Sequence, residues 1–336
     1  MSAAHAIPPH TLSIVAPFYN EEDNIAPLVK RVHEALADYE NPWELVLVDD
    51  GSSDATVDRG LQCTRDYGQH VRVVELTRNY KQTAAMQAGI DAARGDVIVT
   101  MDGDLQNDPV DIPRMVARLL NENLDLVAGW RKNRQDGLVL RKIPSKIANR
   151  LIARMTGVKL RDYGCSLKAY RGDVIKRVRL YGEMHRFIPA WMATVTTPRR
   201  IAEEPTTHHA RTAGVSKYGI SRTFRVILDL IAVFFFMRFR ARPGHFFGSI
   251  GLGLTALAGV IMTWLAWVKF GLGENIGGRP LLIVGIGTLI AGIHFITTGV
   301  LSELLARIYF ESGTIRSYTA RHAPPLGDNE GWHKSA

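Results

Sequence analysis

The sequence predicts an α/β domain with a parallel sheet, followed by two helices that cross a membrane. Over roughly the first hundred residues, short apolar runs alternate with helical patterns, which is typical of strands joined by crossover helices. Near the C-terminus, residues 246–268 are uncharged, and residues 280–302 are interrupted only by His294. Each stretch is long enough for a hydrocarbon core of about 30 Å, which needs about 20 residues.

The elements of the predicted sheet follow one another in regular order. The first apolar run begins at residue 12 and stops at Pro17, and acidic residues start the helix that follows. The second run ends in residues 49–54, where turn and cap residues cluster. The predicted strands cover residues 12–17, 45–48, 71–76 and 96–99, and the predicted helices include residues 25–36 and 83–93.

Each predicted strand leads into residues that can bind a ligand. In open α/β sheets, ligands bind outside the carboxyl ends of the strands. The residues at these ends should therefore meet at one edge of the sheet. They are Pro17, Tyr19 and Glu21 after the first strand, Asp49 and Asp50 after the second, Arg78 after the third, and Asp102 and Asp104 after the fourth.

The fourth strand ends in two carboxylates one residue apart. Alternation along an extended segment would place Asp102 and Asp104 on the same side, with Gly103 leaving room between them and Gln106 adding a neutral oxygen. Hard oxygen ligands of this kind suit Mg²⁺ or Mn²⁺, which share phosphate oxygens of a substrate. The segment is interpreted as a metal and diphosphate site. Paired Asp residues after a strand can also be turn formers.

This ordered set of residues resembles the family-2 inverting glycosyltransferases with the GT-A (Rossmann-like) fold. The most similar group is the polyisoprenyl-phosphate glycosyltransferases, which include dolichol-phosphate mannose synthase and bacterial undecaprenyl-phosphate sugar transferases. The likeness continues through Asn-Arg-Gln-Asp at 133–136, Asp-Tyr-Gly-Cys at 162–165 and Gly-Val-Ser-Lys-Tyr at 214–218. It covers roughly residues 12–320, which is most of the chain.

The resemblance implies a role for each group of residues. The donor nucleotide would be bound by Pro17, Tyr19, Glu21, Asp49, Asp50, Arg78 and Asp102, with Asp49 or Asp50 on the base. The metal would be held by Asp102, Asp104 and Gln106, and the acceptor phosphate by Arg131, Arg141 and Ser145. The catalytic residues would be Asp104, Asp162, Arg141, Arg211 and Lys217, of which Arg211 and Lys217 are candidates to neutralise the departing diphosphate.

The expected nucleophile is a lipid monophosphate, which needs no strong base. A phosphate monoester has a second pKa near 6, so it is largely dianionic at neutral pH. Asp162 then has three readings: a base, a group that orients the acceptor or sugar, or a cap for the turn before Gly164. Direct in-line attack would invert the anomeric centre and give a β-linked product. Lys81 stands where many relatives carry Gly, which leaves the local loop shape and the sugar preference open.

The net charge and the position of the basic residues near the predicted spans indicate the partners. The net charge of +8 calls for an acidic partner, but no nucleic-acid recognition module is present. Basic residues concentrate within residues 131–154, beside the predicted spans, which favours anionic headgroups and a lipid phosphate. The resemblance also implies a homo-oligomer. The expected partners are a nucleotide-sugar, a polyisoprenyl phosphate and the lipid bilayer, with no nucleic acid.

Arginines flank the two spans on their outer ends and set the predicted orientation. They are Arg238, Arg240 and Arg242 before the first span and Arg307, Arg316 and Arg321 after the second. This predicts an integral protein of the cytoplasmic membrane with both termini cytoplasmic. The predicted domains are a cytoplasmic catalytic domain at 1–220, an interfacial amphipathic helix at 221–243, the two spans within 244–303, and a cytoplasmic segment at 304–336. The interfacial segment could instead be a buried core helix of the catalytic domain.

Two other classes of function share part of this pattern. A membrane polysaccharide synthase would use the same donor site, but it would need more spans and a Gln-x-x-Arg-Trp motif, which is absent. A non-catalytic membrane scaffold would not need Asp102, Asp104 and Gln106 together with the nucleotide edge. The sequence therefore favours an enzyme that transfers a sugar from a UDP- or GDP-sugar to a polyisoprenyl phosphate.

Overall fold

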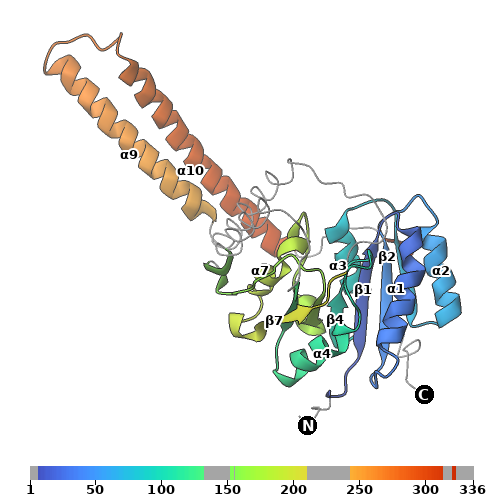
Figure 1. Ribbon diagram of the computed structural model, residues 1–336. Helices are drawn as coiled ribbons and strands as arrows, with labels where there is room; N and C mark the ends of the chain where they lie inside the picture. Colours follow the sequence, from blue (N-terminus) through green and yellow to red (C-terminus); the bar gives the residue numbers. More distant parts are fainter. Residues whose placement is uncertain (1–6, 132–151, 155, 210–242, 313–319, 323–336) are drawn as a thin grey trace. The chain divides into compact units, whose positions relative to one another are not determined.

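The computed structural model describes residues 7–131, 152–154, 156–209, 243–312 and 320–322. The chain divides into two compact units, one formed by Met1–Leu230 with Arg316–Ala336 and the other by Ile231–Ile315. The first unit holds the predicted sheet and the second holds the predicted spans (Figure 1).

In its described residues, the first unit is built on one mixed sheet of eight strands in the order β7-β5-β6-β4-β1-β2-β3-β8. The four predicted strands are neighbours and run parallel, as expected. The sequence did not predict that β6 would run antiparallel between β4 and β5, or that β8 would run antiparallel to β3. The strands are β1 Leu12–Phe18, β2 Trp43–Asp49, β3 Val71–Leu76, β4 Val97–Thr100, β5 Leu126–Arg131, β6 Lys168–Arg171, β7 Ile201–Thr206 and β8 Ala320–His322.

Helices cover both faces of this sheet (Figure 1). On one face, α1, α2 and α4 contribute to the main apolar core. On the other face, α3 packs so closely that a Cβ on Gly89 would lie 2.2 Å from Val15 Cγ1. The helices of this unit are α1 Glu22–Ala35, α2 Thr56–Tyr67, α3 Gln82–Ala92, α4 Asp111–Asn121, α6 Gly172–Ile175 and α7 Ile188–Met192, with short 3₁₀ helices η1 Met184–Phe187 and η2 Pro198–Arg200.

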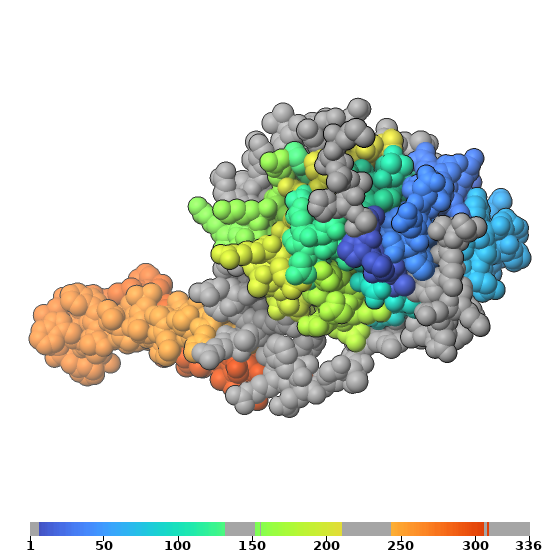
Figure 2. Space-filling view, turned by 90° about the horizontal axis from the view of Figure 1, so that it is seen from below, coloured from blue at the N-terminus to red at the C-terminus, as the bar shows by residue number. Residues whose placement is uncertain are grey.

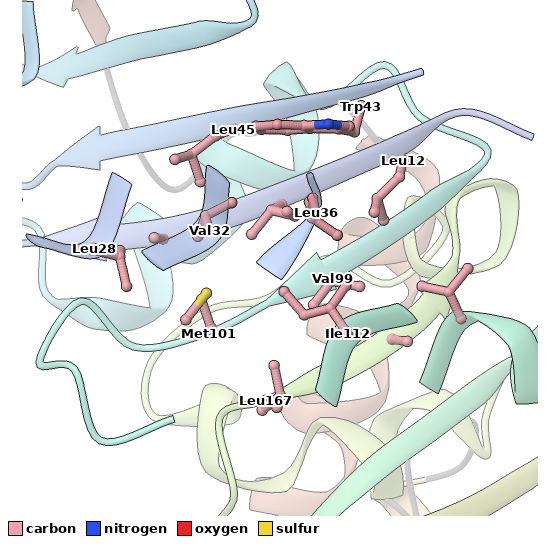
Figure 3. Packing of buried hydrophobic residues seen from close by; sticks show 14 of the residues in the cluster. Leu12, Leu28, Val32, Leu36, Trp43, Leu45, Val99, Met101, Ile112 and Leu167 are labelled. Atoms are coloured by element: carbon pink, nitrogen blue, oxygen red, sulfur yellow. The ribbon is translucent and has the colours of Figure 1, made fainter. Parts of the chain in front are cut away.

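The core between the sheet and these helices is fully buried. Figure 3 shows Leu28 and Val32 of α1, and Leu36 directly after this helix, over the sheet, with Ile112 of α4 beside Val99 of β4. Alternate residues of the strands face this core, as the period of a strand requires. The segments from β1 to β7, blue through yellow in Figure 2, gather in one continuous body. The core fixes the strands whose ends carry the predicted site.

A buried ionic network lies near the amino ends of the strands. Glu44 is inaccessible to solvent. Its Oε1 accepts hydrogen bonds from Ser13 Oγ (2.7 Å) and the Arg94 N–H (2.9 Å). Its Oε2 accepts from Arg72 Nη1 (2.7 Å) and Arg94 Nη2 (2.8 Å). One carboxylate thus joins β1, β2 and β3 to the chain that follows α3.

The second unit is a pair of long apolar helices, α9 Pro243–Phe270 and α10 Pro280–Ser312, which lie side by side (Figure 1). Both are long and apolar enough to cross a membrane, and they contain the two predicted spans. Small residues allow their close approach. A Cβ on Gly251 would lie 2.6 Å from Ile296 Cγ1. Of the predicted interfacial helix at 221–243, only the last residue lies within the described part of the chain.

Candidate active site

The loops that follow the parallel strands meet at the carboxyl edge of the sheet, as the sequence predicted. In the strand register, Phe18 is paired with Asp49, and Asp49 with Glu75. On the other side of β1, Val15 is paired with Thr100. The predicted donor-site residues therefore start from neighbouring positions at one level of the sheet.

The antiparallel strand β6 brings a second group of residues to the same edge. Lys168 at the start of β6 is paired with Thr100 of β4 and with Ala128 of β5. The end of β5 at Arg131 and the chain that leads into β6, including Asp162, thus lie toward the end of the sheet that carries the paired carboxylates. Sequence reasoning assigned these residues only by resemblance, because nothing local indicates an antiparallel insertion.

The turn after β2 presents a buried carboxylate oxygen. Asp49 Oδ2 accepts hydrogen bonds from the N–H groups of Gly51 and Ser52, each 3.0 Å long. Asp49 Oδ1 is buried without a hydrogen-bond partner. Gly51 has a φ of +69°, and a Cβ there would lie 2.3 Å from the carbonyl carbon of Arg78. Only glycine allows this approach between the turn and the loop after β3.

Asp50 fastens the loop after β3 to the same turn. Its Oδ1 accepts a hydrogen bond of 2.7 Å from the Tyr80 N–H. Burial raises the pKa of Asp50, against the hydrogen bonds from the N–H groups of Tyr80 and Lys81. Of the two carboxylates that sequence reasoning left open for the base, Asp49 has the unpaired oxygen and Asp50 is engaged with the backbone.

Of the three predicted residues beside this turn, Pro17 lies within β1, and Tyr19 and Glu21 follow the strand. Pro17 is paired with Val48 in the register, and Tyr19 is 44% exposed. The N–H of Glu21 donates to Thr56 Oγ1 (3.0 Å) at the start of α2. Tyr19 thus offers an accessible ring close to the turn that carries Asp49.

The paired carboxylates lie in a turn rather than on an extended strand, so the alternation argument was wrong. Strand β4 ends at Thr100, and Leu105 has a φ of +61°. Asp104 Oδ1 accepts a hydrogen bond of 3.2 Å from the Gln106 N–H, which closes the turn. The two carboxylates still lie close enough to interact, because burial and then the charge of Asp104 raise the pKa of Asp102.

The residues of this turn fit a divalent cation. A Cβ on Gly103 would lie 2.5 Å from Phe18 Cε1, so glycine is required where the turn crosses that ring. Two carboxylates that repel each other in a partly buried place are stabilised by a cation between them. Within the described residues, no group of three or more His, Cys, Asp or Glu side chains could hold a metal. The set of Asp102, Asp104 and Gln106 suits an ion that keeps water and phosphate ligands.

Side chains that the sequence analysis missed support these carboxylates. Gln82 Nε2 at the start of α3 donates to Asp102 Oδ1 (2.8 Å), and Asn107 Nδ2 donates to Ser166 Oγ (2.7 Å). A hydrogen bond from Ser166 to Asp102 counteracts the rise in the pKa of that carboxyl. The available signal was the polar pair Ser166 and Lys168, two residues apart at the start of a buried strand.

Arg131 and Asp162 form a two-point ion pair. Arg131 Nε and Nη2 donate to Asp162 Oδ2 (2.7 Å) and Oδ1 (3.0 Å). The Gly164 N–H donates to Asp162 Oδ1 (3.1 Å), and the Asp162 N–H donates to Glu203 Oε1 (2.9 Å). The acceptor positions of the Asp162 carboxylate are largely occupied, and β7 anchors its backbone through Glu203.

The electrostatics of this pair favour an orienting role for Asp162. Burial alone would raise the pKa of Asp162, but the Arg131 guanidinium outweighs it and holds that pKa below its usual value. An efficient general base has a pKa near the working pH. The geometry also includes the predicted turn cap, since Asp162 accepts from the Gly164 N–H. Asp162 therefore holds the Arg131 guanidinium in place through this ion pair.

We expect replacement of Asp162 by alanine and of Arg131 by alanine to be strongly non-additive. Each removes the partner of a mostly buried charge, so each should lower kcat/KM for a prenyl phosphate about 10- to 100-fold, whereas the double variant should lose little more. Single-variant kinetics combined in a double-mutant cycle measure this coupling. If the two losses simply multiply, the residues act separately. If Asp162→Asn removes the acidic limb of the kcat pH profile, Asp162 is a base after all.

Several predicted residues lie outside the described part of the chain. They are Arg141, Ser145, Arg211 and Lys217. Their assigned roles at the acceptor phosphate and the leaving diphosphate remain predictions.

The parallel strands lead to two turns at one edge of the sheet, one that carries Asp49 and one that carries Asp102 and Asp104. This arrangement is that of a GT-A glycosyltransferase domain. Comparison with known proteins agrees. The family model described as "Glycosyl transferase family 2" matches residues 13–179. The domain also resembles the crystal structure of glucosyl-3-phosphoglycerate synthase from Mycobacterium tuberculosis, with a TM-score of 0.51 and 21% identity over 67% of this chain and 80% of that one. At this identity, the similarity establishes the fold.

Two relatives resemble nearly the whole chain. Dodecaprenyl-phosphate galacturonate synthase from Rhizobium johnstonii is 60% identical over 310 residues, which are 92% of each chain. Undecaprenyl-phosphate 4-deoxy-4-formamido-L-arabinose transferase from Pseudomonas fluorescens is 36% identical over 95% of this chain and 94% of that protein. The chain belongs to glycosyl transferase family 2, in the group of polyisoprenyl-phosphate glycosyltransferases, as the resemblance implied.

Proposed function

We propose that this enzyme transfers galacturonate from a UDP- or GDP-linked donor to a polyisoprenyl phosphate, either dodecaprenyl, undecaprenyl or dolichyl phosphate. The observation that carries the proposal is 60% identity, along 92% of both chains, to a dodecaprenyl-phosphate galacturonate synthase. The site supports it, because the paired carboxylates Asp102 and Asp104 lie at the same sheet edge as the Asp49 turn. A nucleotide and its diphosphate can be held along that edge.

Each part of the edge then has a task in the reaction. Asp49 accepts from the base, and Tyr19 borders the nucleoside. Asp102, Asp104 and Gln106 would hold Mg²⁺ or Mn²⁺, which neutralises charge on the departing nucleoside diphosphate. Arg131, oriented by Asp162, faces the acceptor phosphate together with Arg141 and Ser145, and Arg211 and Lys217 contribute positive charge at the leaving group.

The stereochemistry follows from a single displacement. The lipid phosphate is dianionic and attacks the anomeric carbon from the side opposite the diphosphate, so the carbon–oxygen bond to the diphosphate breaks as the new bond forms. The product is a β-linked polyisoprenyl-phosphate sugar from an α-linked donor. No proton has to be removed from the nucleophile, which agrees with an Asp162 that orients rather than deprotonates.

The helices α9 and α10 are proposed to hold the enzyme in the cytoplasmic membrane, with the catalytic domain and both termini on the cytoplasmic side. The outer arginines favour this orientation. The segment 221–243 would lie in the interface, where it meets anionic headgroups. We further propose a homo-oligomer that packs through the helices α9 and α10.

Transfer of a labelled sugar into extractable lipid tests this function. Full-length enzyme in membranes would be supplied with undecaprenyl phosphate and, in separate reactions, with UDP-galacturonate, UDP-galactose, UDP-glucose or GDP-mannose. We expect label in a mild-acid-labile lipid with UDP-galacturonate above the others. Label in a polymer would instead indicate a polysaccharide synthase. Donors that all remain unchanged would indicate a non-catalytic protein.

A further inference from the structure

Lys81 adopts a backbone conformation that side chains rarely allow. It precedes α3 with a φ of 77° and a ψ of 163°. This region is populated almost only by glycine, because a Cβ there collides with the neighbouring peptide groups. Three other described residues with positive φ and a side chain, Asn20, Leu105 and Asn123, have φ values of only 50–61°. Lys81 is therefore the most strained of these positions.

The surrounding structure enforces this conformation from both sides. The N–H groups of Tyr80 and Lys81 donate to the Asp50 carboxylate. The carbonyl of Lys81 accepts from the N–H groups of Ala84 (3.1 Å) and Ala85 (3.2 Å), which begins α3. One side of the residue is thus fixed to the turn after β2 and the other to a helix. A glycine would satisfy both backbone constraints without strain, so the backbone geometry gives no reason for a lysine.

The strained residue lies at the donor edge. Its neighbour Gln82 donates to Asp102 Oδ1 at 2.8 Å, and Asp102 is a ligand of the proposed metal and diphosphate site. The sugar of a nucleotide-sugar is attached to that diphosphate. The Lys81 side chain is exposed and forms no salt bridge within the described residues, although its charge acts on the Asp50 carboxylate and lowers the pKa of that group. Arg78 stacks on Tyr80, with 4.8 Å between guanidinium carbon and ring centroid, and Arg131 is paired with Asp162.

We propose that Lys81 is a specificity-determining residue whose ammonium group binds the carboxylate of a uronic acid donor. This inference rests on the proposed transfer of galacturonate and assigns the recognition of its charge to one residue. A cation beside the diphosphate would also attract neutral donors. The role of Lys81 is therefore tested by the ratio of kcat/KM for a charged donor to kcat/KM for a neutral donor, since the diphosphate is common to both.

Three variants separate the charge of Lys81 from its strain. Lys81→Met removes the charge and keeps the Cβ, so the strain remains. Lys81→Gly removes both, and Lys81→Arg keeps both. Lys30→Met serves as the matched control, because Lys30 lies on α1, is 68% exposed and pairs only loosely with Glu34 at 3.8 Å. It changes the net charge by the same amount away from the site.

Full-length enzyme would be assayed with undecaprenyl phosphate and either UDP-galacturonate or UDP-galactose, which differ at C6 by a carboxylate and a hydroxymethyl group. The wild type should prefer the uronate. Lys81→Met should lower the ratio of the two kcat/KM values at least about tenfold, mostly through KM of the uronate donor, with an unchanged Tm. Lys81→Gly should lower the ratio equally and raise Tm. Lys81→Arg and Lys30→Met should keep the preference.

The possible failures are distinguishable. If the wild type shows no preference for the uronate, or transfers neither sugar, the proposed function fails. If the wild type prefers the uronate and Lys81→Met keeps that preference, the role of Lys81 is overturned. An equal loss of both donors in Lys81→Met also overturns it, because Lys81 would then bind only the shared diphosphate.

Discussion

Replacement of Glu44 by glutamine should destabilise the catalytic domain by about 3–5 kcal/mol, because it leaves two buried guanidinium groups without a counter-charge. Glu44 is inaccessible to solvent, and the side chains of Arg72 and Arg94 are 6% and 12% exposed. Urea denaturation of the full-length protein in detergent, followed by tryptophan fluorescence, measures the change. Glu34→Gln is the matched control, since its partner Lys30 is solvent-exposed. It should change stability by less than about 0.5 kcal/mol.

The same network predicts a pH dependence of stability. Burial alone would raise the pKa of Glu44, but the Arg72 guanidinium and the hydrogen bonds from Ser13 and Arg94 outweigh it and hold the pKa below its usual value. A lowered folded-state pKa contributes stability that is present above the unfolded-state pKa and lost as pH falls through the folded one. The wild type should lose this contribution below about pH 4.5, and Glu44→Gln should not. Parallel curves for the two proteins would contradict the assignment.

The parallel half of the sheet could be predicted because its signals are local. Apolar runs of strand length separated by helical patterns give β1 to β4 to within about two residues, and strand polarity then places Asp49 and Asp102 at one edge. The two apolar helices could be predicted from the sequence equally well, because an uncharged stretch of this length most often forms a membrane-spanning helix.

The antiparallel half could not be derived in this way. Strand β6 is four residues long and places Lys168 between β4 and β5, and no periodicity marks so short an element. The contact of Arg131 with Asp162 spans 31 residues of chain and depends on that insertion. The resemblance named both residues, but only the fold shows that they are paired.

The turn after β4 brings the two carboxylates together for a different reason from the one that the sequence suggested. Alternation on an extended strand was expected to bring Asp102 and Asp104 together, yet the strand has ended and a positive φ at Leu105 shapes the turn. Lys81 is a related case. The resemblance suggested that glycine would fit this loop, but only the backbone angles show the strain at Lys81.

Replacement of Asp104 by alanine should reduce sugar transfer on the order of a thousandfold or more while leaving the protein folded. The change would remove one of the two anionic oxygen ligands of the proposed cation at the diphosphate, and electrostatic stabilisation of a leaving group is commonly the largest part of such catalysis. It removes the hydrogen bond from the Gln106 N–H, but it also relieves the charge repulsion that, after burial, raises the pKa of Asp102, so the Tm should change little. Label transfer to undecaprenyl phosphate and the Tm of each protein measure the two effects.

Metal dependence provides the independent half of this test. EDTA should abolish transfer by the wild type, and Mg²⁺ or Mn²⁺ should restore it, whereas neither ion should rescue Asp104→Ala. Asp66→Ala on the exposed side of α2, where the carboxylate accepts a hydrogen bond of 2.7 Å from Gln62 Nε2, should retain activity. Full turnover by the wild type in chelator would show that Asp102 and Asp104 serve the turn itself. The charge of the departing diphosphate would then have to be balanced by the basic residues of this edge alone.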